Sequence, residues 1–514
     1  MNGAESLIQT LIDGGVNVCF ANPGTSEMHF VAALDRHPEM RCILCLFEGG
    51  VTGAADGYFR MTSEVAATLL HLAPGFGNGF ANTHNAGKAG SGVLNIVGDH
   101  ATYHLKYDAP LRGDVQGISQ AVSHWTRSSA DAHSVASDGA SALRAARSNG
   151  GQIATLILPA NTAWEDAHGP APHSEPPALH RPRMDEIVSA AEALKRPGAT
   201  LMPGGIALHT DLALIAGRIA AKTGCTLRAD YFVPRITRGA GTVAMQRLEY
   251  AIDGNVDRLS DTTHLVLCGA GLPVAFFAYP GKPSLPVSAD CHVIDLCSAQ
   301  MDVAWTLNAL ADELDARTGV EPVFTELALP ALPTGDMCLS KLAHSLSALM
   351  PEDAVVIDES ITSGREFLPA TEASRRHDWL HLTGGAIGQG LPSAVGAAIA
   401  CPDRKVIVLT GDGTAMYTLQ SLWTMARENL DVTVVVFANR GYQILRAEFE
   451  HVGAGEMGKN AMRMFDVDEP LLDWVALAKG HGVEGTRVSD IDAFNAAYRD
   501  GLAREEPYLI EVVC

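Results

Sequence analysis

Two polar residues stand where their oxygens could hold a hard cation. Asp412 lies between two glycines after the apolar run Val406–Leu409, and Asn439 follows the apolar run Val432–Ala438, with 25 residues between the second glycine and Asn439. One carboxylate and one amide oxygen fill only part of the octahedral coordination shell of such a cation. A backbone carbonyl, water and phosphate oxygens of a ligand would supply the rest. Mg²⁺ is usually held in this way beside a diphosphate.

The surroundings of Asp412 favour an anion. Gly411 and Gly413 allow close backbone approach, and the N-terminus of a following helix attracts negative charge. A simpler interpretation is that Asp412 only caps a helix and Asn439 only forms an Asx turn. The spacing, together with the two preceding strands, favours the metal.

Alternating strands and helices must position these residues. Two segments without apolar periodicity, 168–183 and 320–336, divide the chain into 1–167, 184–319 and 337–514. Continuous apolar strands alternating with helices predict parallel sheets covered on both faces, so we expect an α/β protein of three domains with parallel sheets flanked by helices. The first and third domains look like two copies of one plan. The expected strands are Val16–Phe20, Cys42–Phe47, Val65–His71, Val93–Val97, Ile153–Leu158, Thr200–Met202, Leu265–Leu267, Ala354–Ile357, Trp379–Leu382, Val406–Leu409, Val432–Ala438 and Tyr508–Val513.

Expected helices include one over about 4–13, one from Ser26 and one running to Arg60. Another follows Asp412, where apolar residues with helical spacing predict one buried stripe; these are Leu419, Leu422, Trp423, Ala426 and Leu430.

Glycine clusters and polar residues gather after the strands of the first and third domains. Ligands bind at the carboxyl ends of strands in open parallel sheets, so these segments are expected at one binding edge. They are NPGTSE (22–27), Glu48, HLAPGFGNG (71–79), GDH (98–100), DESITSG (358–364), TGGAIGQG (383–390), GDGTA (411–415) and NRGY (439–442).

The composition excludes several classes of partner. Net charge is −22, so neither nucleic acid nor an anionic membrane is an expected partner. Ten scattered cysteines, several of them inside apolar runs, predict buried thiols in a reducing compartment. The chain has no run of about 18 apolar residues and no leader-like N-terminus, so we expect a cytoplasmic protein.

The segment that begins with GDG (411–413) and reaches Asn439 after 25 further residues resembles the motif of thiamine diphosphate (ThDP)-dependent enzymes. The resemblance covers the whole chain. It implies a pyrimidine-binding domain (1–167), a central domain (184–319) and a diphosphate-binding domain (337–514). It further implies Mg²⁺ ligation by Asp412, Asn439 and the Gly441 carbonyl. The implied cofactor-binding residues of the third domain are Ser360, Ile361, Thr362, Gly385, Ile387, Gly411, Gly413, Thr414 and Tyr442, with Ile387 beneath the thiazolium ring of a bent cofactor.

LFEGGVTGAADGYFR resembles the family's activating-glutamate block, which makes Glu48 the catalytic carboxylate. Such a glutamate bonds N1′ of the aminopyrimidine, so that the 4′-imino nitrogen can remove the C2 proton and the ylid can attack a ketone. A helix N-terminal carboxylate is the simpler reading of Glu48. Because Glu48 and Asp412 lie on different domains, the cofactor must bridge two sheets. In the family the bridge runs between subunits, which implies a homodimer or homotetramer, although the sequence alone also allows bridging within one chain.

Within the family, the chain most resembles acetolactate synthase large subunits and benzoylformate decarboxylases. ANPGTSEM matches the decarboxylase loop beside the substrate carboxylate: Asn22, Pro23 and Gly24 would lie near the cofactor, and Thr25 and Ser26 near the substrate. His71 takes the position of a catalytic histidine that could relay protons, or else it is a strand-end histidine bonded to a carbonyl.

The sequence also departs from both groups. Phe276 and Phe277 stand where the decarboxylases carry a second histidine, so the pocket should be more apolar. The C-terminal arginine and tryptophan contacts of biosynthetic acetolactate synthases are not found. FAD is allowed by the resemblance, but only the weak glycine turn CGAGLP (268–273) would support it.

We therefore expect a ThDP- and Mg²⁺-dependent enzyme acting on a small-molecule 2-oxo acid. It would decarboxylate the acid to a ThDP-bound enamine and ligate it to a second carbonyl, as acetolactate synthase does. The alternative is a simple decarboxylase that releases an aldehyde. A non-catalytic protein of the same fold is a remote alternative, and a nicotinamide-dependent dehydrogenase is disfavoured because the first and third domains lack GxGxxG.

Overall fold

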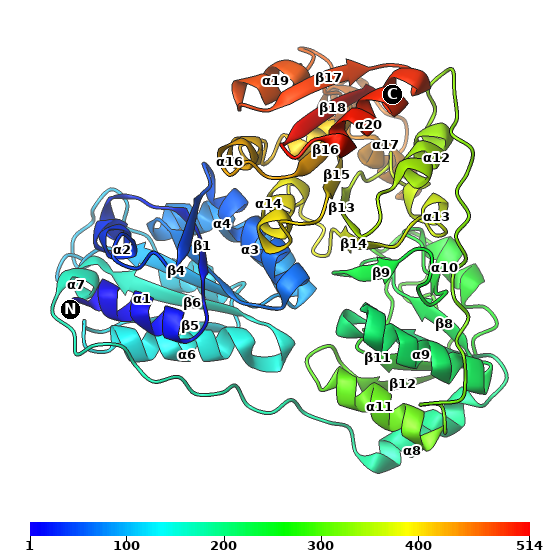
Figure 1. The fold of residues 1–514 in the computed structure, drawn as a ribbon, viewed down its shortest axis with the longest axis horizontal. Coiled ribbons are helices and arrows are strands. Elements are labelled where there is room, and N and C mark those ends of the chain that lie inside the picture. The colour runs from blue at the N-terminus through cyan, green and yellow to red at the C-terminus, as the bar shows by residue number, and fades with distance from the viewer.

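The computed structural model describes residues 1–514 as three α/β units (Figure 1). A six-stranded sheet occupies the N-terminal unit, a five-stranded sheet the middle unit and a seven-stranded sheet the C-terminal unit. Residues 167–183 carry no helix or strand and run from the first unit to the middle unit along the lower edge of Figure 1. The expected α/β architecture of parallel sheets with flanking helices is confirmed.

The first sheet is wholly parallel, in the order β2-β1-β3-β4-β6-β5. Its strands are β1 (Val18–Asn22), β2 (Arg41–Leu44), β3 (Ala66–Leu70), β4 (Val93–Asp99), β5 (Trp125–Ser128) and β6 (Ile153–Pro159). The helices are α1 (Gly3–Asp13), α2 (Met28–Leu34), α3 (Glu48–Thr62), α4 (Leu72–Ala89), α5 (Val115–Gln120), α6 (Val135–Arg147) and α7 (Ala160–Trp164). Strand β3 ends at Leu70, so the predicted Val65–His71 was one residue too long at its end and His71 caps α4 instead.

The third sheet has the order β17-β18-β16-β15-β13-β14-β9. Its strands are β13 (Ala354–Glu359), β14 (His377–His381), β15 (Val406–Gly411), β16 (Val432–Ala438), β17 (Glu484–Val488), β18 (Tyr508–Val513) and the antiparallel β9 (Ile236–Arg238), which comes from the middle segment. The helices are α12 (Leu339–Leu349), α13 (Phe367–Ala370), α14 (Gly390–Ala400), α15 (Asp412–Ala415), α16 (Ser421–Arg427), α17 (Gln443–His451), α18 (Lys459–Phe465), α19 (Trp474–Gly480) and α20 (Ile491–Ala503).

The middle sheet is also parallel, in the order β10-β8-β7-β11-β12. It consists of β7 (Ala199–Pro203), β8 (Thr226–Ala229), β10 (Gln246–Arg247), β11 (His264–Cys268) and β12 (His292–Cys297), with α8 (Met184–Leu194), α9 (Thr210–Thr223), α10 (Ile252–Arg258) and α11 (Val303–Glu313).

Most of the strands that the sequence pattern did not predict lie at the edges of their sheets. Five of the six, β5, β9, β10, β12 and β17, lie at sheet edges. Edge strands expose polar side chains and so lack the continuous apolar run of a central strand. The sixth, β8, lies beside the two-residue edge strand β10 and alternates buried with half-buried residues.

The single helix predicted after Asp412 is wrong, because the structure divides it into α15 and α16. Residues 416–420 form a turn between them, in which the Thr418 hydroxyl donates to the Gly388 carbonyl at 3.0 Å. A Cβ on Gly388 would lie 2.6 Å from that of Tyr417. Contact with the glycine loop therefore interrupts a helix that the apolar periodicity favours.

Helices α3 and α14 hold the first and third units together, and they lie side by side at the centre of Figure 1. Their backbones touch: a Cβ on Gly396 would lie 1.9 Å from the Ala54 carbonyl oxygen, and one on Gly57 would lie 2.1 Å from that of Ser393. Glycine is required at both positions because no side chain fits. One apolar core accordingly runs without a break from the first sheet to the third.

A buried ion pair reinforces this contact. Arg60 and Asp56 on α3 bond at 2.7 Å with side chains 3% and 0% exposed. Arg60 also donates to the His381 carbonyl at 2.8 Å and to the Thr383 hydroxyl at 2.9 Å, and Gln389 donates to Asp56 at 2.5 Å. The charges are thus fully hydrogen-bonded, as burial requires, and they tie α3 to both ends of the loop before α14.

None of the helices is both long and apolar enough to cross a membrane.

Gly396→Ala should lower the free energy of unfolding by about 2 kcal/mol or more, because the new methyl meets backbone that cannot yield. Urea unfolding followed by circular dichroism measures the change. Gly480→Ala is the matched control, since its Cβ meets nothing within 4 Å at the end of α19. Equal stability of the two variants would contradict the close helix contact.

Candidate active site

Asp412 and Asn439 lie at the adjoining ends of neighbouring parallel strands. Strands β15 and β16 pair in register up to Gly411 and Phe437, just before the two residues. The Asp412 carboxylate accepts the backbone N–H of Gly413 through Oδ1 and that of Arg440 through Oδ2, both at 2.8 Å. Asn439 donates its amide to the Ser363 hydroxyl at 3.3 Å. The predicted meeting of these two strand ends is therefore a feature of the fold.

The donor set at this edge fits a divalent cation. Burial raises the pKa of Asp412, although hydrogen bonds from the amides of Arg440 and Gly413 lower it. A buried carboxylate without a cationic partner is stabilised by a bound metal ion. Together with the Asn439 amide oxygen and the Gly441 carbonyl, it offers the hard oxygen ligands that Mg²⁺ prefers.

Four residues predicted to bind the diphosphate lie at the same strand edge; these are Gly411, Gly413, Thr414 and Tyr442. Gly411 begins the turn into α15, and its carbonyl accepts the Thr414 hydroxyl at 3.1 Å. A Cβ on Gly413 would lie 2.6 Å from the Tyr442 ring, so glycine is required for the ring to pack here.

An apolar cavity of about 400 Å³ opens beside this edge. Ile361, Gly385, Ile387 and Tyr442 line it, together with Phe276, Phe277, Tyr417, Ile444, Leu445 and Met464. Ile361 has φ +51°, which a β-branched residue rarely adopts, and such strain is typical of functional sites.

The glycine loop that carries Gly385 and Ile387 is anchored by a buried carboxylate. Glu359, at the end of β13, accepts the backbone N–H groups of Gly388, Gln389 and Gly390 at 2.7–2.9 Å. Burial raises the pKa of Glu359 to about 7, even though these three hydrogen bonds lower it.

The neighbouring Ser360 and Thr362 have different surroundings. The Ser360 hydroxyl donates to Asp358 at 2.5 Å, which restricts its rotation. Thr362 is half-buried and lies between Ile361 and Ser363.

Glu48 begins α3 in the first unit and is 9% exposed. Asn78 on α4 donates to its Oε2 at 3.0 Å. A Cβ on Gly75 would lie 3.1 Å from Oε1, so this glycine keeps the space beside the carboxylate open. Glu48 forms no ion pair within 4.0 Å. It lies at the helix N-terminus, as the simpler interpretation expects, and its catalytic role stays a prediction.

His71 is held by a carboxylate that the sequence analysis did not single out. Its Nδ1 lies 2.8 Å from Glu27 Oε2 and 3.3 Å from the Ser26 hydroxyl, and Ser26 donates to Glu27 Oε1 at 2.5 Å. Glu27 is buried, and Gly24 leaves room for the imidazole, since its Cβ would lie 2.2 Å from the ring. Hydrogen bonding to Glu27 leaves Nε2 as the nitrogen available for proton transfer.

The other residues of this loop are less engaged. Thr25 is exposed, whereas Asn22 ends β1 and Pro23 follows it, both half-buried. His71 and Glu48 flank Gly75, whose Cβ would lie 3.3 Å from the His71 Cβ. The structure thus brings Ser26, His71 and Glu48 to one edge of the first sheet.

The predicted residues of the first unit do not line the apolar cavity. Every residue that lines the 400 Å³ cavity has a number of 231 or higher, so Glu48, His71 and Ser26 are not among them. Within one chain, this cavity is therefore lined by the middle and third units alone.

Three residues of these edges escaped the sequence analysis. Glu27 and Asn78 lie inside the quoted loops NPGTSE and HLAPGFGNG, yet only the fold shows what they bond. His381 ends β14 and lines the apolar cavity, and burial lowers its pKa.

Comparison with known proteins identifies the domains that carry the two edges. Residues 1–124 match the family model of the thiamine pyrophosphate (ThDP) enzyme N-terminal TPP-binding domain, and residues 363–512 match the C-terminal TPP-binding domain. The chain is 49% identical, over 100% of its length and 99% of the relative's, to a Mycobacterium tuberculosis protein provisionally named acetolactate synthase large subunit IlvX. It is 28% identical to the benzoylformate decarboxylase of Pseudomonas aeruginosa, over 97% and 96% of the two chains.

Among solved structures, a ThDP-dependent 4-hydroxybenzoylformate decarboxylase of Rhodococcus jostii RHA1 superposes with a TM-score of 0.85 over 100% and 99% of the two chains. Its sequence identity is 23%, so this likeness concerns the fold alone.

Stability should fall as pH rises from about 4.5 to about 7, in part because of Glu359. Its folded pKa lies above the unfolded value, so the native state binds the extra proton in this range and unfolding releases it. Urea unfolding at pH 5 and 7.5 measures the free energy of unfolding. Its decrease between the two pH values should be smaller in Glu359→Gln than in wild type, by up to about 3 kcal/mol. Glu352→Gln, at an exposed residue two positions before β13, should behave as wild type. An unchanged pH dependence in Glu359→Gln would contradict the assignment.

Proposed function

Because the chain belongs to the thiamine diphosphate-dependent enzyme family, we propose that it binds ThDP with Mg²⁺ and acts on a 2-oxo acid. One observation carries the proposal: Asp412 and Asn439 meet at the ends of β15 and β16, with the Asp412 carboxylate bonded to the residue after Asn439. Bound ThDP would supply a nucleophilic carbon and an electron sink for loss of CO₂ from the acid. FAD is not part of the proposal.

The third unit would bind the metal and the diphosphate. Asp412, Asn439 and the Gly441 carbonyl would hold Mg²⁺, and the turn at Gly411–Thr414 would approach the diphosphate. Ile387 would support the thiazolium ring, because it lines the cavity beside this edge. Glu359 holds the loop of Ile387 in place and so acts as a positioning residue.

The first unit would supply proton transfer. Glu48 would bond the aminopyrimidine, with Asn78 fixing the orientation of its carboxylate. His71 would exchange a proton with the reacting carbon through Nε2, while Glu27 fixes the ring through Nδ1. Ser26 and Thr25 lie on the adjoining loop, within reach of a substrate carboxylate at the same edge.

We propose that these two edges meet between two copies of the chain. Within one chain, no residue numbered below 231 lines the apolar cavity. A homodimer related by a twofold axis would place the Glu48 edge of each chain opposite the Asp412 edge of its partner, giving two equivalent sites.

The proposed reaction is decarboxylation followed by carboligation, as in acetolactate synthase. Identity of 49% over the full length with the relative of that name supports it. Simple decarboxylation is the second candidate, and a specific observation favours it: Phe276, Phe277 and Tyr417 line a cavity of about 400 Å³, which exceeds what the methyl group of pyruvate fills.

Product analysis by NMR separates the two reactions. The protein is incubated with ThDP and Mg²⁺ on pyruvate and, separately, on benzoylformate. Formation of acetolactate from pyruvate is the expected result, and free aldehyde from either acid would move the protein to the decarboxylases. Consumption of neither acid would contradict the proposed substrate class.

Glu48→Gln should bind ThDP and Mg²⁺ with nearly unchanged affinity, yet slow exchange of the C2 proton for deuterium by about 100-fold or more, because the amide cannot cycle a proton. Quenched-flow NMR measures the exchange, and calorimetry measures the binding. Glu64→Gln, beyond the end of α3, serves as control. Wild-type exchange in Glu48→Gln would remove its catalytic role.

Glu27→Gln should lower turnover about tenfold or more by freeing the His71 ring. If Glu27 acts through His71, the double variant with His71→Ala should be no slower than His71→Ala alone, because contacting residues that act as a unit are not additive. The pH profile of turnover should change in both single variants alike. Additive losses in the double variant would show that Glu27 acts separately.

A further inference from the structure

The wall that the middle unit contributes to the apolar cavity of about 400 Å³ is aromatic. The ring centroids of Phe232 and Phe276 lie 5.4 Å apart, and those of Phe276 and Phe277 lie 4.8 Å apart. Phe276 also reaches the glycine loop of the third unit, since a Cβ on Gly385 would lie 3.0 Å from its Cζ. Phe276 and Phe277 are 39% and 54% exposed. Exposed aromatic surface inside a cavity is typical of a ligand-binding site.

A histidine and an aspartate lie within this aromatic wall. His381 ends β14 and Asp358 lies in β13, and the two residues are Cα partners in neighbouring parallel strands. Both line the apolar cavity, and His381 Nε2 lies 3.9 Å from Asp358 Oδ2. The rings of Tyr231 and Phe232 pack edge-on against the His381 imidazole, at 4.8 and 5.4 Å between centroids. The strand ends therefore place this His381–Asp358 pair among aromatic rings.

The hydrogen bonds of the His381–Asp358 pair leave one acceptor atom free on each side chain. His381 Nδ1 lies 3.2 Å from the Leu382 carbonyl, which can only accept, so Nδ1 carries the proton and Nε2 is an acceptor. Burial lowers the pKa of His381, which keeps the ring neutral at neutral pH. Asp358 Oδ1 accepts the backbone N–H and the hydroxyl of Ser360, at 3.0 and 2.5 Å, whereas Oδ2 accepts no hydrogen bond. Neither Nε2 nor Oδ2 is among the polar atoms that the protein encloses without a partner, so both are accessible to a ligand.

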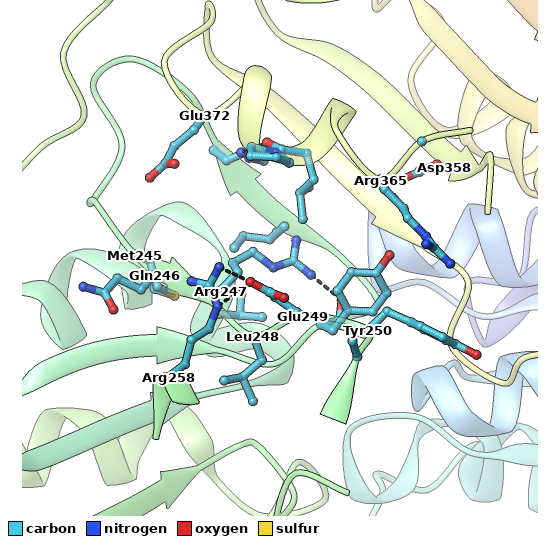
Figure 2. A pocket seen from close by; sticks show the side chains of 18 of the residues that line it. Met245, Gln246, Arg247, Leu248, Glu249, Tyr250, Arg258, Asp358, Arg365 and Glu372 are labelled. Atoms are coloured by element: carbon cyan, nitrogen blue, oxygen red, sulfur yellow. Dashed lines mark hydrogen bonds and ion pairs between the residues drawn. The ribbon is translucent and has the colours of Figure 1, made fainter. Parts of the chain in front are cut away.

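The charges around the apolar cavity do not favour an anionic group on the ligand. Its lining contains the carboxylates of Asp358, Glu359 and Glu448 and the guanidinium of Arg365. Asp358 and Arg365 also border the larger neighbouring cavity of about 630 Å³ (Figure 2). Glu359 is engaged by three backbone N–H groups, and Glu448 Oε2 is enclosed by the protein. Because the two free atoms of the His381–Asp358 pair are both acceptors, the ligand group that suits them is neutral and donates a hydrogen bond.

We propose that the apolar cavity receives an aromatic ring that carries a hydroxyl, as the side chain of a carbonyl substrate. This inference rests on the proposed function and names the substrate class that its site takes. The ring would pack against Phe232 and Phe276, and its hydroxyl would donate to Asp358 Oδ2, the charged acceptor, with His381 Nε2 as the second acceptor within reach. A substrate carboxylate would face the Ser26 edge instead. The ring enters either on the 2-oxo acid that loses CO₂ or on the carbonyl compound that is joined to it.

Binding of para-hydroxyacetophenone and acetophenone to the full-length protein, measured by ligand-observed NMR titration, tests the site without any turnover. The two ketones differ by one hydroxyl, and neither has a charge or a carboxylate to lose. They therefore report on the cavity with or without ThDP, which keeps this test distinct from that of the proposed function. The hydroxylated ketone should bind about tenfold or more tightly, because a hydrogen bond to a charged acceptor is strong. Equal binding of the two ketones, or binding of neither, would overturn the proposal.

Two activity assays with ThDP and Mg²⁺ distinguish how the ring enters the reaction. Release of CO₂ from para-hydroxyphenylpyruvate, with a proton taking its place, shows that the ring arrives on the acid. With pyruvate and para-hydroxybenzaldehyde, the product of interest is the mixed hydroxy ketone. It forms when the acyl carbon of pyruvate is joined to the aldehyde carbon, CO₂ leaves and the aldehyde oxygen takes up a proton, and it shows that the ring arrives on the acceptor. The productive substrate should exceed its counterpart without the hydroxyl about tenfold in kcat/KM, because the free acceptors stay unpaired with that counterpart. No product in either assay, with the hydroxylated ketone bound preferentially, would contradict the proposed function and still support this ligand site.

Asp358→Asn should reduce the preference for the hydroxylated ketone to about threefold or less, since it removes the charged acceptor and keeps the shape of the side chain. His381→Asn keeps a donor for the Leu382 carbonyl but lacks Nε2, and it should also lower the preference; it keeps the test available if Asp358→Asn fails to fold. His377→Asn is the matched control, because His377 begins the same strand, bonds a backbone carbonyl through Nδ1 at 2.8 Å and lines neither cavity. Circular dichroism checks that each variant is folded. A wild-type preference in both cavity variants would overturn the proposal.

Discussion

The contact between α3 and α14 fixes the position of Glu48 relative to the glycine loop that carries Ile387. Gly57 and Gly396 let the two helices touch through their backbones, and the buried pair of Asp56 and Arg60 locks their register. Glu48 is the first residue of one helix, and the glycine loop before the other carries Ile387. The two groups keep their relative position, because helices in such close contact cannot slide along each other without clashes.

The sequence predicted the central strands, since continuous apolar runs identify buried parallel strands, and it thereby placed Asp412 and Asn439 at neighbouring strand ends. It did not predict edge strands such as β17, which exposes Glu484 and Arg487. Nor did it predict that Glu27 bonds His71, because that contact joins two loops 44 residues apart. The break between α15 and α16 was missed for a similar reason: Thr418 bonds Gly388, which no local pattern reveals.

The buried carboxylates at the strand ends of the third sheet are compensated in different ways. Glu359 accepts hydrogen bonds from three backbone N–H groups. Its pKa is still raised, because these bonds compensate only part of the hydration that the carboxylate loses on burial. Asp412 is expected to be neutralised by a metal ion. A fold retains such groups where ligands supply the opposite charge, so the distribution of unpaired groups outlines the binding surfaces.

The assembly of the site from two chains is tested most directly with mixed dimers of Glu48→Gln and Asp412→Ala chains, co-expressed with different affinity tags and purified through both. Exchange of the ThDP C2 proton is then compared with that of each pure variant. If the edges meet between chains, one of the two sites in a mixed dimer keeps both intact residues, and exchange should return to about half of the wild-type rate. Mixed dimers as slow as the pure variants would contradict the account and would require Glu48 and Asp412 of the same chain to act together.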